Sequence, residues 1–166
     1  LCITRYNIMV ENELIFIPFN TPALKNSKVK TSKGIFSSPT VKKYLRKLGI
    51  QSYSSSKKTV LGYVTRPNEF EKLREQFEKA LLNKGFPILI CFHFVRDSKR
   101  LFDFGNATEI IFDLLTAHDI IPDDNVSFIF PSIMTVDGIL PNEENIRELE
   151  WYSINKEESG VWIKIV

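Results

Sequence analysis

Three aspartates flank one predicted helix and could bind a divalent cation. Asp103 comes just before this helix, and the adjacent pair Asp123 and Asp124 follows it after a short return segment. Carboxylate oxygens are hard ligands that suit Mg²⁺, which proteins commonly hold through one or two carboxylates together with waters and phosphate oxygens. Such an ion could activate a water and stabilise the charge on a phosphate under attack. The residue types therefore point to phosphodiester chemistry, provided that the carboxylates meet.

The length of the chain permits this meeting. The helix is predicted over residues 107–117 and would be about 16 Å long. Residues 117–124 can span up to about 23 Å when extended, so the chain can return along the helix and place Asp124 near Asp103. Aspartates beside loops also serve as helix caps or in solvated turns, so the spacing alone leaves both interpretations open.

The strands that must position these residues are predicted from β-prone apolar runs. The longest run, PILICFHFV at residues 87–95, predicts a central strand. Residues 18–36 are rich in lysine, serine, threonine and asparagine and are predicted as a loop. Further strands are predicted at residues 1–10, 14–17, 126–134 and 161–166, and a short helix at 143–149 within an acidic connection, 137–159.

Three helices are predicted from capping signals and helical periodicity. Ser38 followed by Pro39 starts the first helix. A capping pattern of Asn68 and Glu71 starts the second, and Asn106 with Glu109 repeats the pattern before the key helix. Strands and helices alternate irregularly, which predicts an α+β fold: a single two-layer domain over residues 1–166, with a mixed sheet packed with about three helices.

Charge is divided unevenly along the chain. Residues 14–68 contain no aspartate or glutamate and eleven basic residues, whereas the other residues carry eleven basic and all 20 acidic residues. Such asymmetry indicates a polyanion-binding surface beside an acidic site. A solvated basic face explains the same pattern equally well.

Composition restricts the class of protein. The chain is 43% hydrophobic and 25% charged, as soluble globular domains are, and no apolar run approaches a membrane span. Two distant cysteines, Cys2 and Cys91, do not form a disulfide framework. We therefore expect a cytoplasmic protein with no membrane partner and no small-molecule cofactor.

The stretch KRLFDFGNATEIIFDLLTAHDIIPDDNV resembles the core motif of the RusA family of Holliday-junction resolvases. That motif has a basic lead-in, Asp-x-Asp-Asn, a helix with a Phe-Asp-x-Leu step, and Asp-Asp before a strand. Here the matching residues fall in register without a gap: Lys99, Arg100, Asp103, Asn106, 112–115, Asp123 and Asp124. The resemblance covers about residue 14 to the end, which makes residues 1–13 an N-terminal addition and 137–159 an acidic insertion.

The resemblance implies a homodimeric, Mg²⁺-dependent endodeoxyribonuclease, with Mn²⁺ as a substitute metal. Such enzymes resolve four-way or branched DNA in recombination and repair and are often carried by phages and prophages. It implies that Asp103 and Asp124 are catalytic metal ligands assisted by Asp123, that Asn106 orients the first helical turn, and that Asp113 supports it. The expected contacts to DNA phosphates are Lys28, Lys42, Lys43, Lys99 and Arg100.

The chain departs from the family motif at two positions. Gly105 stands where the motif has its second acidic residue, and Glu109 replaces a lysine. Glu109 either substitutes for the missing carboxylate or caps its own helix through the Asn106 amide. The leading hypothesis is an endonuclease, and the alternative is a junction-binding protein of the same family with impaired catalysis. A third hypothesis, based on charge alone, is that the acidic segment 137–159 contacts a protein partner.

Overall fold

The computed structural model describes residues 14–23, 28–32, 34–51, 63–64 and 69–166. These residues form an α+β fold with three helices and a five-stranded mixed sheet, which confirms the predicted fold class. The strand predicted at residues 1–10 lies outside the described residues. Within the described part, no helix is long and apolar enough to cross a membrane.

The sheet is built around β6 (Ile88–Arg96), the central strand predicted from its apolar run. On one side β6 pairs antiparallel with β9 (Gly160–Ile165), which pairs antiparallel with β1 (Ile15–Pro18). On its other side β6 pairs in parallel first with β7 (Ile129–Ile133) and then, towards its carboxyl end, with β8 (Tyr152–Ile154). The sequence did not predict β8, because three residues carry too little β-pattern to be recognised.

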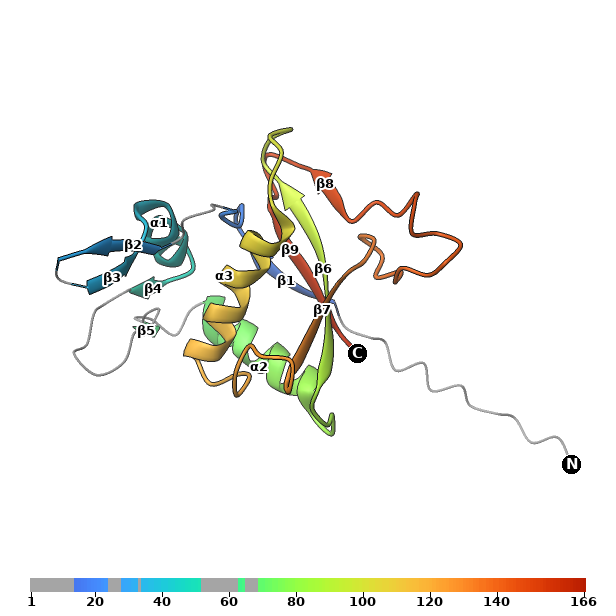
Figure 1. The fold of residues 1–166 in the computed structure, drawn as a ribbon, viewed down its shortest axis with the longest axis horizontal. Coiled ribbons are helices and arrows are strands. Elements are labelled where there is room, and N and C mark those ends of the chain that lie inside the picture. Colours follow the sequence, from blue (N-terminus) through green and yellow to red (C-terminus); the bar gives the residue numbers. More distant parts are fainter. Residues whose placement is uncertain (1–13, 24–27, 33, 52–62, 65–68) are drawn as a thin grey trace, which may run out of the picture.

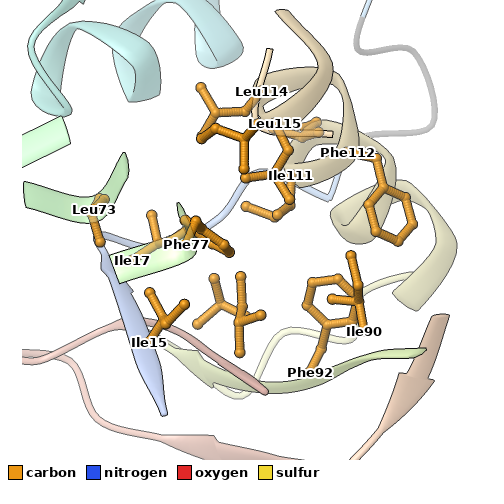
Figure 2. Close-up of a cluster of buried hydrophobic side chains, with 14 of the residues drawn as sticks. Ile15, Ile17, Leu73, Phe77, Ile90, Phe92, Ile111, Phe112, Leu114 and Leu115 are labelled. Atoms are coloured by element: carbon orange, nitrogen blue, oxygen red, sulfur yellow. The ribbon is translucent and has the colours of Figure 1, made fainter. Parts of the chain in front are cut away.

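Two helices cover one face of this sheet (Figure 1). They are α2 (Glu69–Leu81) and α3 (Phe104–Ala117). Alternate residues of the strands point towards them, as the two-residue period of a strand requires. Figure 2 shows the resulting core, formed by Ile15 and Ile17 of β1, Leu73 and Phe77 of α2, Ile90 and Phe92 of β6, and Ile111, Phe112, Leu114 and Leu115 of α3.

The basic part of the chain forms smaller elements beside this core (Figure 1). They are the hairpin of β2 (Lys28–Thr31) and β3 (Gly34–Ser37), helix α1 (Pro39–Lys47), and the pair β4 (Ile50–Gln51) and β5 (Tyr63–Val64). Helix α1 starts as predicted, with the Ser38 hydroxyl accepting from the Val41 amide at 3.3 Å. The loop predicted over residues 18–36 is wrong at its end, where four-residue strands too short to show a clear pattern pair as the hairpin.

The acidic segment 137–159 is tied to the sheet at three points. The Lys164 ammonium donates to the Gly138 carbonyl at 3.1 Å, His93 Nε2 of β6 lies 3.0 Å from the Ser153 hydroxyl, and β8 within the segment pairs with β6. The short helix predicted at 143–149 is wrong. The side chains of Asn142 and Asn145 each accept from the other's backbone amide, which favours turns over a helix.

Candidate functional site

Asp103 is the N-cap of α3. Its Oδ1 atom accepts a hydrogen bond from the Asn106 amide at 3.2 Å, and its backbone is extended, with φ −94° and ψ 122°. The helix thus begins at Phe104, three residues before the predicted start, because an aspartate caps well and its charge is favourable at the positive end of the helix dipole. The donor to Asp103 is the backbone amide of Asn106, so this bond does not depend on the asparagine side chain that was predicted to orient the first turn.

The residues directly before and after Asp103 belong to an aromatic cluster that holds this part of the backbone in place. Phe102 and Phe104 each lie 5.4 Å from the Trp151 ring, between ring centroids. Phe104 also contacts Phe92 of β6, and the Arg96 guanidinium lies 4.4 Å from the Phe102 ring centroid. Such ring pairs have defined geometry and each contributes about 0.5–1.5 kcal/mol beyond burial. The backbone that carries the exposed Asp103 carboxylate is therefore fixed by packed neighbours.

Position 105 lies directly beside this carboxylate. A Cβ atom built on Gly105 would be 3.2 Å from Asp103 Oδ1, and the Gly105 backbone is not in the left-handed region. The backbone therefore does not require glycine, and a side chain at position 105 would share the environment of Asp103. The Glu109 side chain is exposed one turn further along α3. The Asn106 amide, its expected capping partner, donates to Asp103 instead.

Asp123 organises a local turn. Its Oδ1 accepts from the Asp124 amide at 2.8 Å, and its Oδ2 accepts from the Asn125 side-chain amide at 2.7 Å. These bonds, the Asp124 backbone first, lower the pKa of Asp123. Both oxygens of Asp123 thus already have partners, and Asp123 and Asp124 are both exposed.

The structure does not bring Asp103 and Asp124 together within one chain. Helix α3 is longer than predicted, with 14 residues or about 21 Å. The return segment does not run back along it, because the Ile120 amide bonds to the Leu115 carbonyl at the far end of α3. The Ile88 amide at the start of β6 then bonds to Phe128, whereas Asp103 follows the end of β6. The two carboxylates therefore lie at opposite ends of α3.

Asp103 and Asp124 of one chain consequently do not form a shared Mg²⁺ site. Among the residues that the structure describes, no group of three or more histidine, cysteine, aspartate or glutamate side chains could hold a metal ion. Asp113, expected to support the site from behind, is half-buried and ten residues along α3 from Asp103. That separation corresponds to about 15 Å along the helix axis.

The predicted phosphate contacts lie on two elements. Lys42 and Lys43 belong to α1, where Lys43 is exposed and Lys42 half-buried, and Lys99 and Arg100 are exposed on the link between β6 and α3. Lys28 lies in β2. The loop after β1 joins α1 to the carboxyl end of β6, because Phe19 lies under the Lys47 ammonium and the Thr21 carbonyl accepts from Arg96. The end of α1 and the link are thus neighbours in the fold.

Sequence reasoning missed Arg96. It is the last residue of β6, only 9% exposed, and its guanidinium packs on Phe102. Burial lowers its pKa, and the nearby charge of Asp97 partly offsets this. The sequence signal that could have identified it is an arginine directly after a long apolar strand. A cation buried at such a position needs specific partners.

Comparisons of the chain with protein-family models, curated proteins and solved structures gave no match.

Proposed function

We propose that this protein binds branched DNA, in the manner expected of a RusA-like resolvase, and that a single chain does not cut it efficiently. The main support for impaired catalysis is the glycine at position 105. The structure places that position against the Asp103 carboxylate, where a second carboxylate would complete a pair, and the chain has glycine there. A lone carboxylate engaged in capping a helix is a weak ligand for Mg²⁺.

The distribution of basic residues supports DNA as the ligand. Helix α1 has no acidic residue in its first turn and carries Arg46 and Lys47 in its last turn. The link adds Lys99 and Arg100, both exposed. Cationic side chains on neighbouring elements supply the counterion release that drives binding to a phosphate backbone.

A labelled four-way junction and a linear duplex of the same sequence test this proposal. We expect tighter binding to the junction, a log Kd that rises linearly with log salt concentration, and no nicking in Mg²⁺ or Mn²⁺. Lys43→Met should weaken binding, whereas Lys84→Met, which removes an exposed lysine beyond the end of α2, should not. Equal affinity for both DNAs, or none, contradicts junction binding, and efficient paired nicks contradict impaired catalysis.

The second candidate is an active endonuclease whose acidic site needs another copy of the chain. One observation favours it: Asp103 and Asp124 are both exposed and lie at opposite ends of α3. A two-fold related copy with an antiparallel α3 would bring Asp103 of one chain towards Asp124 of the other.

Mixed dimers distinguish this candidate. If each site uses one carboxylate from each chain, then Asp103→Asn and Asp124→Asn proteins are each inactive, but their mixture recovers one intact site per mixed dimer. Cleavage by the mixture would establish the shared site. An inactive mixture, with an active wild-type protein, would show that both carboxylates act from the same chain.

A further inference from the structure

A second group of polar side chains lies at the carboxyl end of β6, away from the aspartates. Arg96 ends β6, and its Nη1 donates to the Thr21 carbonyl at 2.5 Å. Tyr44 of α1 is buried beside Thr21, whose hydroxyl is close enough to offset part of the rise that burial causes in the pKa of Tyr44. Asn20 precedes Thr21 in the same loop. We call Asn20, Thr21, Tyr44 and Arg96 the Arg96 cluster.

Each member of the Arg96 cluster has a buried polar atom without a hydrogen-bond partner among the described residues. These atoms are Asn20 Oδ1, Thr21 Oγ1, Tyr44 OH and Arg96 Nε. Thr21 is fully buried, Tyr44 is 3% exposed and Arg96 is 9% exposed. An unpaired buried polar group costs about 1–3 kcal/mol. Four of them in one neighbourhood call for a ligand or for ordered water.

The chemistry of the four groups favours an anion over water. The guanidinium and the two hydroxyls are donors, and an asparagine amide turned by 180° presents its Nδ2 donor where Oδ1 lies. No described carboxylate forms an ion pair with Arg96 within 4 Å, and the Lys47 ammonium lies 5.5 Å from the Phe19 ring centroid in the same loop. Water could satisfy the donors but would leave the buried positive charge compensated only in part, by Asp97.

The loop that carries Asn20 and Thr21 is held in an uncommon conformation. Phe19 has φ 74°, in the left-handed region that a residue with a bulky side chain rarely adopts. Such strain persists only where the surroundings impose it, here through the contacts of Phe19 with Lys47 and of Thr21 with Arg96. These contacts fix the donors of the loop against those of β6 and α1.

We propose that the Arg96 cluster binds a phosphate group. The planar guanidinium matches the oxygens of a phosphate, and the hydroxyls of Thr21 and Tyr44 complete its donors. Asn20 is half-buried and Arg96 keeps a small exposed area, so these two residues place the buried cluster close to the surface. Because Lys99 and Arg100 follow Arg96 on the exposed link, the phosphate is one of a DNA backbone, and in naming DNA this inference rests on the proposed function.

Free phosphate tests the site without DNA. The test is the melting temperature of the whole chain at increasing inorganic phosphate concentration, with ionic strength matched by chloride. It compares wild type with Tyr44→Phe, Thr21→Val and Lys84→Met. Wild type and Lys84→Met should be stabilised by phosphate alike. Tyr44→Phe and Thr21→Val should melt higher than wild type without phosphate, since each loses an unpaired buried hydroxyl, and should bind phosphate about tenfold more weakly.

This pairing of effects separates a binding role from a structural one. If Tyr44→Phe and Thr21→Val melt lower than wild type without phosphate, the hydroxyls are already satisfied inside the fold and the proposal is overturned. If phosphate stabilises both variants as much as wild type, or stabilises none of the proteins, it is overturned as well. Both variants keep the charge and nearly the shape of the wild-type side chain. The test can therefore be made with them even if variants of Arg96 do not fold.

Duplex DNA binding at several salt concentrations tests the source of the phosphate. Tyr44→Phe should weaken binding about tenfold, and Arg96→Met, if folded, should also reduce the slope of log K against log salt by about one. Phosphate stabilisation with unchanged DNA affinity in these variants overturns DNA as the source and assigns the cluster to a free phosphate compound. DNA binding without any stabilisation by phosphate leaves the proposed function standing and overturns the site.

Discussion

At the scale of the residue, the proposed loss of catalysis depends on the absence of a side chain at position 105. Gly105 lies in the first turn of α3, and its backbone conformation suits any L-residue. An aspartate there would place a second carboxylate against Asp103, and like charges so close repel until a cation lies between them. On the proposed function, glycine at position 105 leaves Asp103 without the second carboxylate that a metal site here would need.

Gly105→Asp should create measurable Mn²⁺ binding where wild type has little. The matched control is Gly105→Asn, which has the same size and makes the same contact with Asp103 but carries no charge. Electron paramagnetic resonance titration of free Mn²⁺ reports the binding. Equal Mn²⁺ affinity in both variants would show that the missing carboxylate does not limit metal binding.

The capping role of Asp103 predicts a stability effect separate from any chemistry. Asp103→Ala removes the acceptor of the Asn106 amide and should lower the free energy of unfolding by about 1 kcal/mol. Asp103→Asn keeps a capping oxygen and should cost less, although it loses the charge near the helix dipole. Urea unfolding of the three proteins measures this. Equal losses in both variants would mean that charge, not the cap, stabilises α3.

At the scale of the element, the approach of β1 to β9 depends on a glycine. A Cβ atom at Gly160 would overlap the Ile17 carbonyl and the Phe16 ring, which packs on Trp162 at 4.6 Å between centroids. Gly160→Ala should therefore displace β1 and lower the free energy of unfolding by about 1–3 kcal/mol. Gly85→Ala, where an added Cβ meets nothing within 4 Å, should change stability little. Thermal unfolding distinguishes the two, and similar stability of both variants would contradict this packing.

Elements with local signals could be predicted from the sequence, and relations between distant segments could not. Ser38 and Pro39 mark the start of α1 because capping is a local interaction, and the run in β6 is apolar because the strand is buried. Whether Asp103 and Asp124 meet depends on the path of the return segment, which the sequence does not show. A hydrogen bond from the Ile120 amide to the Leu115 carbonyl turns that segment. Such a backbone bond cannot be predicted from the types of the residues that form it. Arg96 was missed because its partners, Thr21 and Phe102, come from segments that only the fold brings together.

At the scale of the whole molecule, one histidine joins the central strand to the acidic segment. His93 is 1% exposed, and its Nδ1 lies 3.2 Å from the Met134 carbonyl while its Nε2 lies 3.0 Å from the Ser153 hydroxyl. The segment between these partners is also joined to β9, where the Lys164 ammonium donates to the Gly138 carbonyl. The buried imidazole thus joins β6 both to the residue just before the acidic segment and to β8 inside it.

Burial lowers the pKa of His93 below 6.5, and the Met134 and Glu150 carbonyls and the charges of Glu150 and Asp137 offset part of this. Because the unfolded chain binds the proton more readily than the folded one, stability contributed by neutral His93 is present above about pH 6.5 and is lost as pH falls towards the folded pKa. One proton gives a slope of at most about 1.4 kcal/mol per pH unit. We expect the difference in unfolding free energy between wild type and His93→Gln to shrink over that window, as measured by urea unfolding from pH 7.5 to pH 5. A difference that does not change with pH would show that His93 titrates alike in the folded and unfolded chains, and the acidic segment would then be held independently of that proton.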